Sequence, residues 1–307
     1  MAGYTVSGLT AYVEVNKDVL VKNLVLGLAK GDTIRNCRKQ LGIKSKERLN
    51  YLDVDPTLQD GSSCGFSAAS STVFSEREIE TAQIKAQDQF CDRDLLGKFA
   101  EYQVKIAANK DAADMPFEGE IINEVIEKCN EKMERLVWQG SKTGGDLIDG
   151  FATIAAGADS ASTVTVTGSS ATSIYNRVKA VIEAIPEQII DKAVVFLSPA
   201  NFRKLGLTLV EEFKYNSDLF NSNIEGREIF FPGTSVRIHK AHGLTGSDLI
   251  YASAWENMVY GADLENDAEK VRMWYDDNSE LFKYSIHWNS GVQTLYPDMV
   301  VLGDFSA

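Results

Sequence analysis

The stretch FEGEIINEVIEKCNEKMERLVWQ, residues 117–139, decides the fold, because it has the clearest periodicity in the chain. Its apolar residues recur every three or four positions and form one stripe on a helix: Ile122, Val125, Ile126, Cys129, Met133, Leu136 and Val137. Acidic residues stand in the first turns and basic ones near the end, as the helix dipole favours. The pattern predicts one helix, about 35 Å long at 1.5 Å per residue, that stops at Gly140.

Residues 1–53 form a predicted N-terminal arm. Val19 to Leu28 give a helical pattern that is too short to build a core of its own. Residues 1–50 carry nine Lys and Arg against four acidic residues, a net charge of +5, whereas the whole 307-residue chain carries −13. A basic arm on an acidic body indicates an arm that lies on an acidic partner surface or on a polyanion, or else a solvated helix face.

Residues 54–92 form a predicted extended loop. A turn-rich start and a run of small residues (DGSSCGFSAASS) precede a stretch in which polar residues alternate with Ala82, Ile84 and Ala86. This alternation predicts an exposed β-hairpin from about Cys64 to Phe90. Because a two-stranded ribbon is marginally stable alone, we expect a neighbour to support it.

Residues 145–262 have the pattern of a compact α/β unit. A strand is predicted at Val164–Val166, and a helix from Ile174 to Ile185 capped by Ser169 or Ser170. AVVFL (193–197) predicts a central buried strand, and Ser198-Pro199 the start of another helix. Strands follow at 228–231, 235–240 and 248–252. The tail predicts a hairpin of 271–275 with 281–288 and two more short strands.

The sequence holds patterns that imitate enzyme motifs. Ser63 stands in a G-x-S-x-G pattern but lacks the apolar strand before it and the helix after it that a nucleophile elbow needs. His239 and His242 lie three residues apart on a predicted strand and its turn without a third metal ligand, so we expect structural or surface histidines. We assign no catalytic, cofactor-binding or metal-binding residue and no cofactor, and we predict that the chain is not an enzyme. A cytosolic serine hydrolase that uses Ser63 and His287 is the alternative from another class.

Composition narrows the class of protein further. Four cysteines without paired C-x-x-C spacing argue against zinc ribbons and thioredoxin-like redox chemistry: Cys37, Cys64, Cys91 and Cys129. The acidic balance, with a pI of about 4.8, argues against a protein that reads DNA bases. The first residues lack the order of a signal peptide, and Val19 to Ala29 is too short to span a bilayer, so we expect a cytosolic chain.

Three stretches carry a resemblance to a known family: KMERLVWQGSKTGGDLIDGFAT (132–153), VVFLSPANFRKL (194–205) and the segment from Glu256 to Leu302 with its final strand after Pro-Asp. In their order and spacing they resemble the Hong Kong 97-type capsid fold of tailed bacteriophages and encapsulins, over nearly the whole chain. The resemblance implies an α+β fold with an N-terminal arm (1–53), an extended loop (54–92), a first part of the peripheral domain (93–144) with the spine helix 117–139, an axial domain (145–262) and a returning β-layer of the peripheral domain (263–307).

The same resemblance implies a function. It is that of a structural major capsid protein, which assembles through hexamers and pentamers into an icosahedral shell around phage double-stranded DNA. Assembly would take place in the host bacterial cytoplasm and the product would be part of the virion. Implied partners are further copies of the chain, a separate scaffolding protein, a portal and DNA contacted without base reading, but no membrane.

The resemblance leaves the sub-family, a possible cross-link and two alternative functions to consider. DGSSCGFSAASSTVFSEREI (60–79) is similar to capsid proteins of crAss-like and other Bacteroidetes-infecting phages. Some family members cross-link a loop lysine to an asparagine, but no motif match gives Lys85 such a partner, so we assign no cross-link. An encapsulin-type compartment shell is the alternative on the same fold, and a tail-tube or other virion protein is the third possibility.

Overall fold

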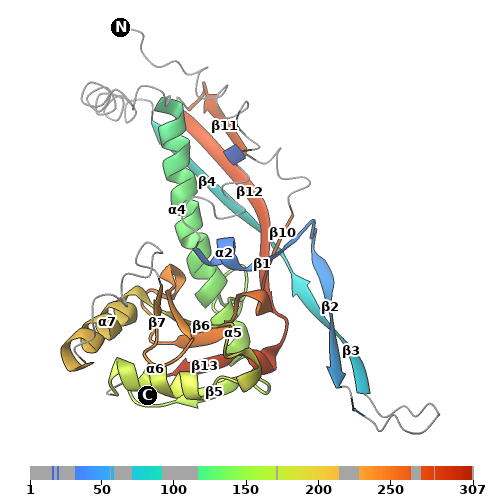
Figure 1. Cartoon of the computed structure of the whole chain (residues 1–307). Helices are drawn as coiled ribbons and strands as arrows, with labels where there is room; N and C mark the ends of the chain where they lie inside the picture. The colour runs from blue at the N-terminus through green and yellow to red at the C-terminus, as the bar shows by residue number, and fades with distance from the viewer. Residues whose placement is uncertain are drawn as a thin grey trace.

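The computed structural model describes residues 16, 19–20, 32–55, 57–58, 71–91, 117–170, 172–213, 228–263, 271–279 and 281–305. They form two β-sheets joined by one long helix, with a two-stranded ribbon that projects away from both sheets (Figure 1). That helix, α4 (Phe117–Gln139), has the bounds that the apolar stripe predicts.

A five-stranded sheet packs against α4. Its path is β1 (Arg38–Leu41), β10 (Met258–Ala262), β12 (Leu281–Thr294) and β11 (Val271–Asp276), and β4 (Ala82–Cys91) pairs with the other edge of β12. Alternate β12 residues Phe282, Ile286 and Trp288 are buried in the core that also holds Ile126 and Met133 of α4. Every second residue of the strand and every third or fourth residue of the helix thus point into the same core.

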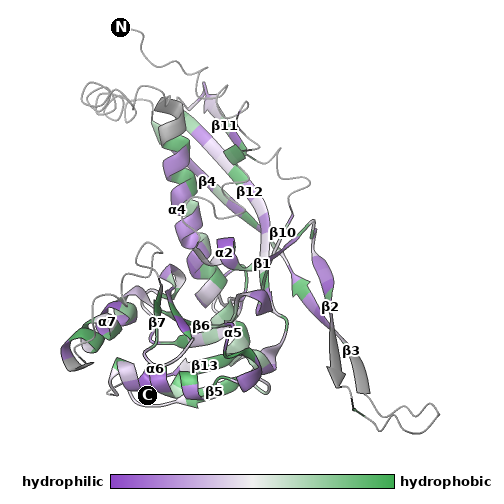
Figure 2. Cartoon of the chain, in the orientation of Figure 1, coloured by the Kyte–Doolittle hydropathy of each residue, from purple (hydrophilic) through white to green (hydrophobic). Residues whose placement is uncertain are grey.

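The six-stranded sheet is the second layer. Its order is β5 (Val164–Thr167), β13 (Val301–Asp304), β9 (Ile250–Ala254), β6 (Ala193–Leu197), β8 (Arg237–Lys240) and β7 (Glu228–Phe230). All five residues of β6 are buried, as the apolar run predicts, and β6 and β13 are mainly hydrophobic (Figure 2). The sheet shares a core with α6 (Ile174–Glu183) and α7 (Pro199–Phe213).

The N-terminal ends of α6 and α7 can be compared with the predicted N-caps. Ser198 accepts a hydrogen bond from the Asn201 backbone N–H at 3.4 Å, so the predicted start of α7 is confirmed. The predicted cap of α6 is wrong: Ser173, and not Ser169 or Ser170, accepts the Asn176 N–H. An N-cap hydroxyl must stand directly before the first helical residue, and Ser173 is the serine in that position.

Trp138 joins the two layers near the end of α4. It has no exposed surface, and its ring lies 5.8 Å from that of Phe151 in α5 (Phe151–Ala156), 4.9 Å from Phe196 and 5.3 Å from Tyr251. Its indole N–H donates to the hydroxyl of Thr33 in α2 (Asp32–Asn36) at 2.7 Å. One aromatic residue therefore ties the six-stranded sheet, the long helix and the N-terminal region together.

The predicted hairpin from Cys64 to Phe90 is wrong in its pairing. β3 (Ser71–Glu80) pairs with β2 (Lys46–Asp55), which starts inside the predicted arm, whereas β4 pairs with β12. The chain changes partner at Thr81, whose N–H donates to the carbonyl of Ser45. The alternation of apolar and polar residues shows which face of a strand is buried, but it does not show which strand lies beside it. The alternation therefore continues through Thr81 although the pairing partner changes there.

Two further strands cross the boundary between the ranges predicted as axial domain and returning β-layer. β10 falls within 145–262 but lies in the five-stranded sheet, and β13 falls within 263–307 but lies in the six-stranded sheet. The chain therefore passes between the two layers more than once after residue 250, a feature that depends on long-range pairing and leaves no local pattern.

Candidate assembly surfaces

The ribbon of β2 and β3 is the part of the described chain with the least support. Its strands pair over ten residues, from Lys46 with Glu80 at the base to Asp55 with Ser71 at the far end. Body contacts on the ribbon include Tyr51, whose ring lies edge-on to Tyr296 with centroids 5.0 Å apart. Farther out, the Phe74 side chain is 83 % exposed. Such a ribbon is not expected to be stable alone in water.

An apolar seat holds the ribbon base. Leu49 and Ile79 are buried in a small core with Ile43, Val259 and Leu295. A glycine pair on the neighbouring strands, Gly261 with Gly291, makes room for it. A Cβ on Gly291 would stand 2.1 Å from the Glu80 carbonyl oxygen, and one on Gly261 would stand 2.8 Å from the Ile79 side chain. Glycine at these two positions lets the ribbon lie this close to β10 and β12.

A buried ion pair lies beside the seat. Nη2 of Arg77 donates to both carboxylate oxygens of Asp159 at 2.7 and 2.8 Å, and to Oε1 of Gln293 at 3.2 Å. The side chains of Arg77 and Asp159 are 16 % and 9 % exposed, which separates this pair from the other ion pairs of the ribbon. The Gln293 amide also donates to the carbonyl of Glu78 at 2.8 Å.

The other ion pairs at the ribbon lie in solvent. Lys46 contacts Glu78 at 2.7 Å and Lys142 contacts Glu80 at 2.6 Å, with all four side chains at least 40 % exposed. The hydrogen bond from Lys142 lowers the pKa of Glu80 from its usual value. Exposed pairs of this kind contribute at most about 1 kcal/mol, so the apolar seat and the buried pair dominate the attachment.

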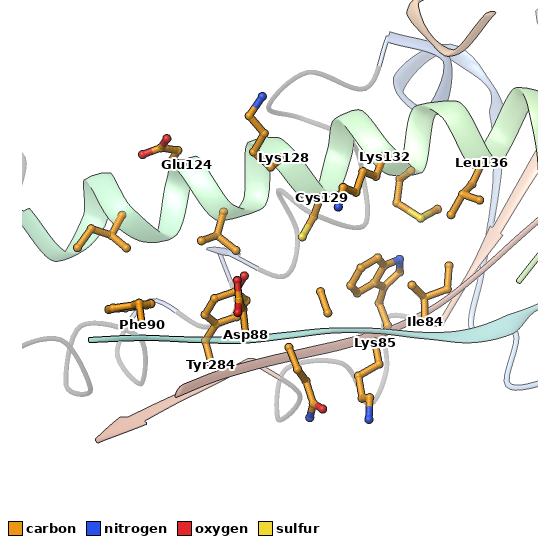
Figure 3. Close-up of a pocket in the computed structure, with 16 residues that line it drawn as sticks. Ile84, Lys85, Asp88, Phe90, Glu124, Lys128, Cys129, Lys132, Leu136 and Tyr284 are labelled. Carbon is orange, nitrogen blue, oxygen red and sulfur yellow. The ribbon is translucent and has the colours of Figure 1, made fainter. Parts of the chain in front are cut away.

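A groove runs between α4 and β4 (Figure 3). It has a volume of about 590 Å³ and a largely apolar lining, with Ile84 and Phe90 on the sheet side and Leu136 on the helix side. Cys129 lies in it, and burial raises the pKa of its thiol. Lys128 stands on the helix side and pairs with Glu131 at 2.9 Å. An apolar groove with charged residues at its rim is a surface that a partner can cover.

Exposed apolar residues also occur on the six-stranded layer. Leu207 and Val210, three residues apart on α7, are 62 % and 51 % exposed, and Phe230 on the edge strand β7 is 45 % exposed. Among the described residues β7 is the edge strand of the sheet, and the exposed apolar side chains of α7 and β7 favour contact with another molecule.

Only one of the two residues of the enzyme alternative is described by the structure. Ser63 lies outside the described residues, as does Cys64. His287 lies on β12, where its Nε2 is 2.8 Å from the hydroxyl of Ser285, a residue only 6 % exposed. His239 is buried against the rings of Phe196 and Trp255.

The remaining candidates lie apart. His242 is exposed at the start of a short 3-10 helix, and Lys85 lies opposite His287 in the sheet. Cys37, Cys91 and Cys129 are free thiols. Within the described ranges no three His, Cys, Asp or Glu residues group as a metal site, and no helix there is long and apolar enough to cross a membrane.

The sequence patterns did not reveal Arg77, Asp159 and Gln293. Arg77 stands two residues before Ile79, on the face of β3 that is buried, so a charge in the buried period of a strand was the available signal. Its acceptors lie 82 and 216 residues further along the chain, and their proximity follows only from the fold.

Comparisons with known proteins find similarity in backbone structure alone. No family model matches the chain, and no curated protein matches its sequence. A chain of the satellite phage P4 procapsid that includes the size determination (Sid) protein aligns with a TM-score of 0.60 at 11 % identity, over 100 % of this chain and 92 % of that one. A chain from Gordonia phage Cozz aligns with a TM-score of 0.55 at 13 % identity, over 90 % and 87 %.

An encapsulin is similar to the same degree. A chain of the SrpI encapsulin complex from Synechococcus elongatus PCC 7942 aligns with a TM-score of 0.56 at 12 % identity, over 89 % of this chain and 86 % of that one. These likenesses show that the chain has the Hong Kong 97-type capsid fold, of class α+β, as the resemblance implied. At identities of 11–13 % these likenesses define the fold of the chain.

Proposed function

We propose that the chain is the major capsid protein of a tailed bacteriophage. Copies would assemble through hexamers and pentamers into an icosahedral shell around double-stranded DNA. The observation that carries this proposal is the ribbon, which projects from the body over ten paired residues (Figure 1) and exposes 83 % of the Phe74 side chain on the face turned away from the body. In a shell, the surface of an adjacent copy would support it. Phage capsid chains among the similar structures favour the same function.

The layers give the proposed domains a physical basis. α4 and the five-stranded sheet would be the peripheral domain, and the six-stranded sheet with α6 and α7 the axial domain. The ribbon would be the extended loop, beginning at Lys46. The predicted arm is then shorter than 1–53, because β1 and β2 belong to the folded body and the ribbon.

The proposed partners follow from the proposed shell. Further copies of the chain come first, and a separate scaffolding protein, a portal and DNA contacted through phosphates at most are the others. The protein would assemble in the host bacterial cytoplasm, become part of the virion, and have no catalytic role. The similarity of residues 60–79 to capsid proteins of crAss-like phages stays a prediction.

Electron microscopy of the purified chain tests the proposal. We expect polyhedral shells, or rings of five and six copies, in negative stain and a matching early peak in size-exclusion chromatography. A monomer that never assembles, even when its genomic neighbours are expressed with it, would refute the container function. Deletion of residues 1–31 tests the arm without removing α2 or β1; we expect soluble protein that forms no shells.

The encapsulin alternative rests on the SrpI likeness, since the fold does not separate the two. The contents of native particles distinguish them. Double-stranded DNA inside the particles supports the phage capsid, whereas an enclosed enzyme without DNA supports the compartment.

A further inference from the structure

The direction of the ribbon is set at the point where it leaves the body. Strand partners share a face of the ribbon, so Arg77 and Leu49 face the body together, followed by Ser75 and Tyr51. Phe74 lies just beyond and is open to solvent. Arg77 thus lies on the body-facing side of the ribbon, between the buried Ile79 and the half-buried Ser75.

Arg77 binds two separate parts of the body at once. Asp159 stands in the turn between α5 and β5, and its own carbonyl accepts the N–H groups of Ser162 and Thr163, directly before Val164 of β5. Gln293 stands near the end of β12 in the other sheet. One guanidinium therefore links the ribbon to the six-stranded and the five-stranded sheets.

Small rotations at this point become large displacements farther out. Ser71 lies six residues beyond Arg77, about 20 Å at the usual rise of a strand. A swing of about 10° at Arg77 would move Ser71 by about 3.5 Å, close to the rise of one residue. A contact between the ribbon and another copy would then change by a full side-chain position.

We infer that Arg77 is a positioning residue for assembly: its buried pair with Asp159, braced by Gln293, fixes the angle of the ribbon and so sets the geometry at which copies join. This inference rests on the proposed shell function. If the Arg77 contacts only stabilised the fold, they would not need to join both sheets. The apolar seat of Leu49 and Ile79 already attaches the ribbon base to the body. Hydrophobic contacts are non-directional, whereas the contacts of Arg77 Nη2 with Asp159 and with Gln293 hold the end of the side chain between two acceptors on different parts of the body.

The test compares Asp159→Asn, Arg77→Lys and the exchange Arg77→Asp/Asp159→Arg with Arg48→Gln. The last variant is the matched control, because Arg48 forms an exposed pair with Glu76 on the same ribbon, with side chains 69 % and 56 % exposed. Two readouts are measured on the full chain: trypsin cleavage after residue 77 in unassembled subunits of the variants that keep Arg or Lys there, and the distribution of particle diameters after assembly of every variant.

Asp159→Asn leaves a buried guanidinium without its carboxylate. We expect cleavage after Arg77 to accelerate by roughly 100-fold, because proteolysis follows the population of released ribbon. Cleavage at sites in the six-stranded layer should not change, and particle diameters should broaden. Arg77→Lys should show an intermediate broadening, because the shorter lysine side chain keeps the charge but does not carry its ammonium group as far towards Asp159 and Gln293. The exchange variant should recover part of the uniform assembly, and the control should match the wild type.

Uniform shells of wild-type diameter from Asp159→Asn would overturn the inference, as would cleavage that accelerates equally throughout the body. Those results leave the proposed function intact, because the wild-type chain still assembles. If the wild-type chain itself forms no shells with any partner, the proposed function fails instead.

Discussion

The bond between Trp138 and Thr33 allows a quantitative test of how the N-terminal region is held. Both residues have no exposed surface, and the indole N–H donates to the Thr33 hydroxyl at 2.7 Å. Trp138→Phe removes the donor and keeps an aromatic ring. Thr33→Val removes the acceptor and keeps the shape of the side chain. Each change leaves the other polar group buried without its partner.

The expected magnitudes follow from burial. A buried polar group left without its partner costs about 1–3 kcal/mol, so each single substitution should lower the free energy of unfolding by about 2 kcal/mol. Trp138→Phe should cost more than Thr33→Val, because it also leaves space between Phe196 and Tyr251. In the double variant neither group is stranded, so the loss should be about 1 kcal/mol smaller than the sum of the two.

Urea unfolding of unassembled subunits, followed by circular dichroism, measures these free energies. The control cycle pairs Trp138→Phe with Thr208→Val, since the Thr208 hydroxyl donates to the Lys204 carbonyl on α7 and shares no partner with Trp138. That cycle should be additive. If the Trp138–Thr33 cycle is additive as well, within about 0.3 kcal/mol, the bond does not hold α2 to α4 and the reasoning is wrong.

Three further predictions concern the ribbon seat, a surface hairpin and the groove. Gly291→Ala should lower the free energy of unfolding by about 1–3 kcal/mol in urea titrations, because its Cβ would stand 2.1 Å from the Glu80 carbonyl oxygen; an unchanged midpoint would contradict the close approach. The hydrogen bond from Lys283 lowers the pKa of Asp276 to about 2 from 3.8, so its contribution to stability is present above pH 3.8 and disappears as the pH falls towards 2. Asp276→Asn should remove that part of the dependence of the thermal midpoint on pH, whereas an unaltered profile would assign it elsewhere. Burial raises the pKa of the Cys129 thiol, so iodoacetamide at pH 8 should alkylate it more slowly than a free peptide thiol, as mass spectrometry can follow; an equal rate would show an open groove.

Local elements were predictable because local periodicity specifies them. The apolar stripe gave the bounds of α4, and the run AVVFL gave β6 with every residue buried. The tail hairpin is confirmed as β11 with β12, although β12 continues to Thr294. In each of these segments one face, or every face, is buried against the body, so the sequence carries the period of the structure.

Partner choice was not predictable in the same way. The alternation from Thr81 to Gln87 is genuine, but its apolar members Ile84 and Ala86 face α4, and the strand lies in a sheet and not in the projecting ribbon. The true partner of β3 starts at Lys46, where charged residues alternate with Leu49 and Tyr51 and resemble a solvated arm. Strand pairing over long sequence distances depends on which surfaces remain open after the helix has packed, and no window of the sequence contains that information.

The candidate assembly surfaces depend on long-range packing in the same way. Two larger cores form around α4 and the two sheets. The ten-residue ribbon, the groove beside α4 and the exposed residues of α7 leave apolar side chains open to contact. A contiguous exposed apolar patch marks a candidate site of contact with another molecule. The ribbon base, in contrast, is fixed by a glycine pair and a buried ion pair, features that a freely moving hairpin does not need. In the proposed shell, a ribbon that these contacts hold where it leaves the body is suited to reach one defined place on a neighbouring copy.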